Sequence, residues 1–127
     1  MAHHETSNES PKAVGCAVVG LGHAGRKRAD VLSQHPLTVL RAISSRRDPQ
    51  TPSLEEVLRD PEIDAIILCR ENAGRASDIR MALEAGKHVL AEYPLAPRAQ
   101  DGRSLIQLAQ RKEKVLHLGL VGLLGAR

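Results

Sequence analysis

The sequence predicts an α/β fold, in which helices cover both faces of a doubly wound parallel sheet. Two observations predict this class. Short apolar runs alternate with segments that carry one apolar face, which is typical of parallel strands joined by crossover helices. The chain also has one tyrosine and no phenylalanine or tryptophan. Its core must therefore be built from Val, Leu, Ile and Ala, which suits strands buried on both faces.

Five apolar runs are expected to form the strands, and the third is apolar enough to be buried on both faces. In chain order they are residues 14–19, 37–44, 63–69, 88–91 and about 115–120.

Helices are predicted between these strands. The first covers about 24–33 and stops before His35-Pro36, because a residue before proline disfavours the helical conformation. The second begins at a capping box, Ser53-Leu-Glu-Glu56. The third ends at Gly86, and the fourth covers about 98–112. The apolar faces of the last three are Leu54, Val57 and Leu58, then Ile79, Ala82 and Leu83, then Leu105, Leu108 and Ala109.

Charge and cysteine content limit the functional class. The formal net charge is +3, but the aromatic platforms and zinc-finger spacings of nucleic-acid binders are missing, so a small anionic ligand is favoured. The sequence predicts no membrane span, no signal peptide and no metal site. Cys16 and Cys69 lie in apolar runs, and we expect them to be buried reduced thiols in a cytoplasmic protein.

A glycine-rich turn, Gly20-Leu-Gly-His-Ala-Gly25, links the first predicted strand to the first predicted helix. In a dinucleotide-binding turn of this spacing, the first glycine permits the tight turn and the second lets the backbone approach the pyrophosphate. The third lets helix and strand pack closely. The following helix N-terminus offers N–H groups and a partial positive charge to phosphate. The motif therefore predicts a Rossmann-type dinucleotide site; the alternative is a tight turn without a ligand.

Ser45-Arg46-Arg47 follows the second predicted strand, where an NAD-specific site carries an acidic residue for the ribose hydroxyls. A carboxylate there would repel a 2′-phosphate, whereas a hydroxyl and two guanidiniums would bind it. We therefore expect NADPH as the cofactor in preference to NADH. The alternative is that the arginines are merely exposed loop residues, and Asp48 reduces the positive field near them.

A third motif is Ala85-Gly-Lys-His-Val-Leu-Ala-Glu-Tyr-Pro-Leu95. Together with Ser45-Arg46-Arg47 and the later Gln110-Arg-Lys-Glu-Lys-Val-Leu-His117, it resembles the N-terminal domain of the Gfo/Idh/MocA oxidoreductases. Within that family the chain is most similar to the biliverdin reductase branch, in which Glu-Tyr-Pro replaces Glu-Lys-Pro. The resemblance covers about residues 14–117.

The resemblance implies that Glu92 and Tyr93 lie beside the nicotinamide as candidate catalytic residues. Tyr93 replaces a lysine that assists proton transfer in sugar dehydrogenases of the family; a tyrosine is a poor base but can donate a hydrogen bond. The alternative is that Tyr93 only packs at the strand end. The implied cofactor-binding residues are Gly20, Leu21, Gly22, His23, Ala24 and Gly25 at the pyrophosphate, Ser45, Arg46 and Arg47 at the adenosine, and Ala73, Gly74, Arg75 and Tyr93 near the cofactor.

The implied activity is NADPH-dependent hydride transfer to biliverdin, a small molecule of haem breakdown, to give bilirubin. Two alternatives stay open: a sugar or cyclitol dehydrogenase of the same family, and a nucleotide-binding module without turnover. We expect a disordered tail over 1–12, the nucleotide-binding domain over 13–120, and over 121–127 the start of a link to a substrate domain that this chain lacks. Arg75 departs from the histidine that family members often have at its position.

Overall fold

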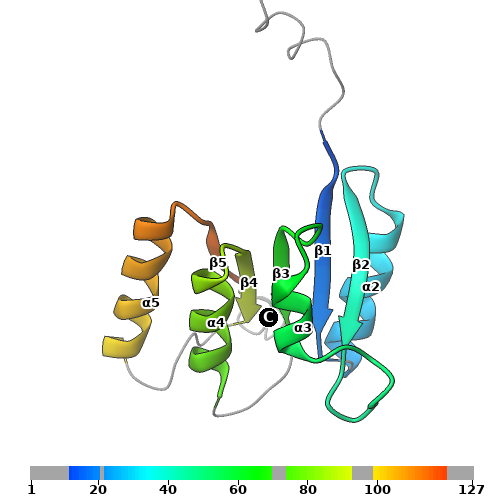
Figure 1. Cartoon of the computed structure of the whole chain (residues 1–127), viewed down its shortest axis with the longest axis horizontal. Coiled ribbons are helices and arrows are strands. Elements are labelled where there is room, and N and C mark those ends of the chain that lie inside the picture. Colours follow the sequence, from blue (N-terminus) through cyan, green and yellow to red (C-terminus); the bar gives the residue numbers. More distant parts are fainter. Residues whose placement is uncertain (1–11, 21, 70–73, 93–98, 120–127) are drawn as a thin grey trace, which may run out of the picture.

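The computed structural model describes residues 12–20, 22–69, 74–92 and 99–119. Strands and helices alternate along these residues (Figure 1). The strands are β1 Val14–Val19, β2 Thr38–Ser44, β3 Ala65–Leu68, β4 His88–Glu92 and β5 Leu116–Gly119. The helices are α2 His23–Gln34, α3 Leu54–Arg59, α4 Arg75–Glu84 and α5 Ala99–Lys112.

The five strands form one parallel sheet in the order β2-β1-β3-β4-β5. The chain runs outward from β1 to β2 and then crosses back to β3 on the other side of β1. The winding direction therefore reverses between β1 and β3, as in a doubly wound sheet. This topology confirms the fold class predicted from the sequence.

Helices cover both faces of the sheet (Figure 1). One face packs against α2 through a small buried cluster made of Cys16, Val18, Ala29 and Ile67. The opposite face packs against α3, α4 and α5 and holds the larger cluster, which includes Ile66, Val89 and the predicted inward residues of these helices. Leu58 is the exception among those residues, because it is only partly buried and packs at the edge of the cluster.

Local signals explain where the helices begin and end. His35 adopts an extended backbone before Pro36 and so ends α2. The predicted capping box is complete: Ser53 Oγ accepts from the Glu56 N–H at 3.1 Å, and Glu56 Oε1 accepts from the Ser53 N–H at 3.0 Å. Gly86 has a φ of +82° after α4, which is the left-handed conformation expected of a glycine at this position.

Several boundaries differ from the prediction by one or two residues. β3 is shorter than expected because Ile63 donates its N–H to the Asp60 carbonyl at 3.2 Å, in the turn after α3. β2 begins at Thr38 and β5 ends at Gly119. Cys16 is buried as expected, whereas Cys69 is only partly buried.

A buried lysine ties the end of α3 to the start of β4. The Lys87 side chain is 7% exposed, and its Nζ donates to the Asp60 carbonyl at 2.8 Å and to the Ile63 carbonyl at 2.6 Å. These carbonyls lie at the amino-terminal edge of the strands, so Lys87 stabilises the edge of the sheet opposite the loops described below.

Candidate functional site

The carboxyl ends of β1, β2 and β3 meet at one edge of the sheet. Val19 is paired with Ser44 on one side and with Leu68 on the other. The N–H of Gly20 donates to the Ser44 carbonyl at 2.7 Å, and the N–H of Cys69 donates to the Val19 carbonyl at 2.8 Å. The loops that leave these strands therefore begin side by side, at the point where the winding reverses, which is where open α/β sheets bind ligands.

At its first and third glycines, the glycine-rich turn has the geometry that its spacing predicts. Gly20 has a φ of +105°, a conformation that favours glycine. A Cβ on Gly25 would lie 2.0 Å from the Gly20 carbonyl oxygen, so this position requires close backbone contact. Among the described residues, a Cβ on Gly22 would meet nothing within 4 Å, and Gly22 has an extended backbone that any residue adopts. The surrounding described residues thus account for glycine at two of the three positions, and Gly22 faces open space.

The N-terminus of α2 faces the same space. His23 and Ala24 form its first turn after the N-cap Gly22, and Leu21 lies outside the described residues. Among the residues that the structure describes, no side chain caps this helix and its first turn has no acidic residue. The positive end of the helix dipole is therefore available to an anion.

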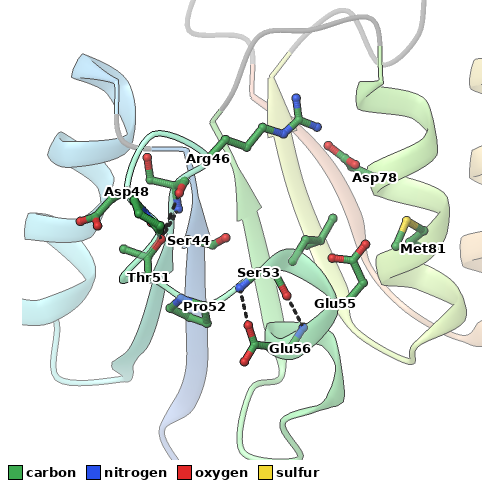
Figure 2. A pocket seen from close by; sticks show the side chains of 13 residues that line it. Ser44, Arg46, Asp48, Thr51, Pro52, Ser53, Glu55, Glu56, Asp78 and Met81 are labelled. Atoms are coloured by element: carbon green, nitrogen blue, oxygen red, sulfur yellow. Dashed lines mark hydrogen bonds between the residues drawn. The ribbon is translucent and has the colours of Figure 1, made fainter.

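Two of the three predicted adenosine residues, Ser45 and Arg46, line a pocket of about 410 Å³ beside the end of β2. Ser45 is partly buried, whereas Arg46 and Arg47 are exposed. Figure 2 shows the Arg46 side chain extending across the pocket toward α4, with its guanidinium pointing toward the carboxylate of Asp78. The remaining lining residues are Ser44, Asp48, Pro49, Thr51, Pro52, Ser53, Leu54, Glu55, Glu56 and Met81.

Carboxylates give the pocket a mixed charge. Asp78 is buried in the first turn of α4, while Glu55 and Glu56 are exposed in the first turn of α3. The pKa of Glu56 is lowered, first because its carboxylate accepts the Ser53 N–H and then because it interacts with the Ser53 side chain. Arg46 is the basic residue of the pocket lining, so it carries the positive charge within the pocket.

The remaining predicted residues that the structure describes lie at or near the same edge. Gly74 is the N-cap of α4 and Arg75 is its first residue, partly buried. Glu92 ends β4 and pairs with Gly119 of β5, one residue beyond the pairing of Ala91 with Leu68. Ala73 and Tyr93 lie outside the described residues. The structure thus brings the described parts of the glycine turn, the β2 loop, the start of α4 and the end of β4 to one edge.

Sequence reasoning did not assign most of the pocket lining to a site, and Thr51, Asp78 and Met81 are three examples. Thr51 lies in a polar segment without a motif, although its hydroxyl bonds both Ser45 and Asp48. Asp78 has the appearance of an ordinary helix residue in the sequence, and Met81 that of a core residue. The only available signal was the capping box, because it places the α3 N-terminus directly after the β2 loop.

Two further findings concern the whole described chain. No group of three or more potential metal-ligating side chains occurs among the described residues. The helices of the described part are all too short or too polar to cross a membrane.

Burial and the nearby charge of Asp64 raise the pKa of the Cys16 thiol.

Comparisons with known proteins agree with this geometry. The model of the Gfo/Idh/MocA oxidoreductase family, with its NAD-binding Rossmann fold, matches residues 14–120. Biliverdin reductase A of Mus musculus is 38% identical over 120 residues, which cover 87% of this chain and 41% of the mouse protein. The chain therefore spans less than half the length of this relative.

Two other similarities bear on function. The crystal structure of biliverdin reductase from Synechocystis, in complex with biliverdin and NADP+, matches with a TM-score of 0.80 and 31% identity, over 87% of this chain and 39% of that chain. Myo-inositol 2-dehydrogenase of Thermotoga maritima is 25% identical over 115 residues, which cover 80% of this chain and 34% of that protein.

Proposed function

The chain belongs to the Gfo/Idh/MocA oxidoreductase family and carries its NAD-binding Rossmann domain, and from this premise we propose that it binds NADPH and acts in biliverdin reduction. The observation that carries the proposal is the position of Ser45, Arg46 and Arg47 directly after β2, beside the pocket and level with the start of the glycine turn. We further propose that residues 13–120 act as the cofactor domain.

The preference for NADPH rests on charge. An NAD-specific site has a carboxylate after the second strand to bind the ribose hydroxyls. Here the corresponding residues are a hydroxyl and two exposed guanidiniums, which would bind a 2′-phosphate through charge-assisted hydrogen bonds. The pocket lining also contains the carboxylates of Asp48, Glu55 and Asp78. These negative charges would disfavour a phosphate at any position that is not next to the arginines.

The glycine turn fits the pyrophosphate. A Cβ at Gly22 would project into space that none of the described residues fills, so a ligand that occupies this space would explain glycine at that position. The N-terminus of α2, which no side chain of the described part caps, would donate backbone N–H groups to the pyrophosphate, and its dipole would stabilise the negative charge. The turn would thereby fix the cofactor relative to the edge of the sheet.

The nicotinamide, when bound, supplies the hydride, and the protein supplies binding and orientation. We propose that Glu92 and Tyr93 lie beside it at the end of β4, with Tyr93 donating a hydrogen bond or positioning a ring. Residues 73–75 would approach the cofactor from the start of α4. Biliverdin is proposed as the substrate because the mouse relative and the Synechocystis structure are biliverdin reductases.

A second candidate is hydride transfer with a sugar or cyclitol, which the similarity to myo-inositol 2-dehydrogenase supports. Tyr93 argues against it, because the sugar dehydrogenases of the family use a lysine at this position. A third candidate is a nucleotide-binding module without turnover.

The test is a titration of the full chain with NADPH and with NADH, in which nicotinamide fluorescence reports binding. We expect tighter binding of NADPH, and bilirubin absorbance after biliverdin is added. Replacing Arg46 and Arg47 by alanine should lower the affinity for NADPH about tenfold or more and change the affinity for NADH little, because a charge-assisted hydrogen bond contributes about 1.5–3 kcal/mol.

Arg103→Ala removes an exposed cation from α5 and is the matched control, with no expected effect on either nucleotide. If the Arg46 and Arg47 variants lost equal affinity for NADPH and for NADH, this would contradict the role of these arginines in binding the 2′-phosphate. NADPH binding without bilirubin formation would support the module without turnover, and binding of neither nucleotide would contradict the cofactor site.

A further inference from the structure

The side chain of Thr51 joins the two ends of the loop that follows β2. Its Oγ1 accepts the Ser45 N–H at 2.9 Å and donates toward two carbonyl oxygens, that of Asp48 at 2.7 Å and that of Ser45 at 3.0 Å. Figure 2 shows Thr51 beside Asp48 at the edge of the pocket. One hydroxyl group therefore contacts the backbone at the start and in the middle of this loop.

Backbone hydrogen bonds complete the closure of residues 45–51. The Thr51 N–H donates to the Asp48 carbonyl at 3.0 Å, and the Asp48 N–H donates to the Ser45 carbonyl at 3.2 Å. We call residues 45–51, closed in this way, the β2 loop ring. Because the Thr51 hydroxyl takes part in three of these contacts, its removal would free the ring more than the loss of any other side chain named in it.

The ring contains both proposed phosphate ligands. Arg46 and Arg47 follow Ser45 directly and are exposed, so the ring fixes the backbone from which their side chains extend. The Arg47 N–H donates to Ser45 Oγ at 3.3 Å. Since Ser45 Oγ is an acceptor in this bond, its own proton can be donated to an anion. A backbone that is already ordered loses less conformational freedom when it binds a ligand.

We infer that Thr51 is a positioning residue for cofactor selection: its hydroxyl holds Ser45, Arg46 and Arg47 in the arrangement that receives the 2′-phosphate. This inference rests on the proposed function, which assigns the phosphate to those three residues. Thr51 acts through the ring, because its hydroxyl is bonded to the backbone of Ser45 and Asp48. NADH lacks the 2′-phosphate, so its binding depends less on the ring.

The experiment compares the affinities of the full chain for NADPH and NADH by nicotinamide fluorescence. Thr51→Val keeps the shape of the side chain and removes the hydroxyl. We expect it to lower the ratio of NADPH affinity to NADH affinity about tenfold, which corresponds to about 1.4 kcal/mol. Thr51→Ser keeps the hydroxyl and should restore the ratio of the unmodified chain.

Thr38→Val is the matched control. Thr38 lies at the opposite end of β2, and its hydroxyl donates to the Leu32 carbonyl at 2.7 Å. The control loses the same kind of hydrogen bond and should keep the ratio unchanged. Urea denaturation of each variant verifies folding, and Thr51→Ala, which also lacks the hydroxyl, replaces Thr51→Val if the latter does not fold.

The outcomes separate this inference from its premise. An unmodified chain that binds both nucleotides equally would overturn the proposed NADPH preference, and the inference with it. An unmodified chain that prefers NADPH, with a Thr51→Val variant that keeps this preference, would overturn the inference alone. If Thr51→Val weakened the binding of both nucleotides equally, the role of Thr51 would be purely structural, and this result would also overturn the inference.

Discussion

Replacing Gly22 by alanine tests whether a ligand is the reason for glycine at this position. The backbone of Gly22 has φ −69° and ψ −173°, which alanine adopts freely, and the added Cβ would meet none of the described residues within 4 Å. Alanine restricts the unfolded chain, which stabilises by about 0.4–1 kcal/mol. It is also a poorer N-cap than glycine, which costs a similar amount. We therefore expect the free energy of unfolding to change by less than about 1 kcal/mol.

Cofactor binding should respond differently. The Cβ of the Gly22→Ala variant would enter the space that the proposed function assigns to the pyrophosphate. We expect NADPH and NADH to bind at least about tenfold more weakly, a loss of at least about 1.4 kcal/mol. Both nucleotides should be affected equally because both contain the pyrophosphate. The assay combines urea denaturation with nicotinamide fluorescence titration of the same preparation.

Two other glycines are the controls. Gly25→Ala would place a Cβ 2.0 Å from the Gly20 carbonyl oxygen, so it should destabilise the fold as well as weaken binding. Gly86→Ala also meets open space, but its φ of +82° makes alanine unfavourable by about 1 kcal/mol, with no effect on binding. A Gly22→Ala variant that binds NADPH as tightly as the unmodified chain would refute the assignment of the pyrophosphate to this turn.

Two further predictions concern stability. Lys87→Met removes the donor to the Asp60 and Ile63 carbonyls. It should lower the free energy of unfolding, measured in urea, by about 1–3 kcal/mol without changing nucleotide affinity. An unchanged free energy of unfolding would contradict the stabilising role of Lys87. Folding lowers the pKa of Glu56 from its ordinary value of 4.5. The ionised Glu56 side chain therefore contributes fully to the free energy of unfolding above its unfolded-state pKa, and this contribution is lost as the pH falls through its folded-state pKa. Glu56→Gln keeps the capping geometry but does not titrate, so its stability should fall less steeply than that of the unmodified chain between about pH 5 and 3; parallel slopes would exclude the effect.

Local signals explain which features the sequence could predict. The capping box at Ser53 and Glu56, the left-handed Gly86 and the turn at Gly20 each depend on residues close together in the chain, and all three occur as predicted. The alternation of strands and helices predicted the doubly wound parallel sheet, whereas the strand order comes from the structure. The predicted features needed no knowledge of distant contacts.

Features that depend on tertiary packing could not be predicted in the same way. Asp78 is a polar residue in a helix, and its burial and its place in the pocket, together with residues of the β2 loop and α3, depend on the tertiary arrangement. The function of Thr51 depends on how residues 45–51 fold back, which no periodicity indicates. Tyr93, the proposed residue beside the nicotinamide, lies outside the described residues and stays a prediction.

The β2 loop ring has a consequence for how cofactor preference can evolve. Its hydrogen bonds begin and end within residues 45–51, and its arginines are exposed rather than part of the buried clusters. Substitutions at Arg46 or Arg47 therefore leave the core unchanged, and surface substitutions of this kind usually alter stability by less than about 0.5 kcal/mol. Under the proposed function, mutation and selection would exchange one nicotinamide cofactor for the other through a few changes in this loop, while the fold that presents it stays intact.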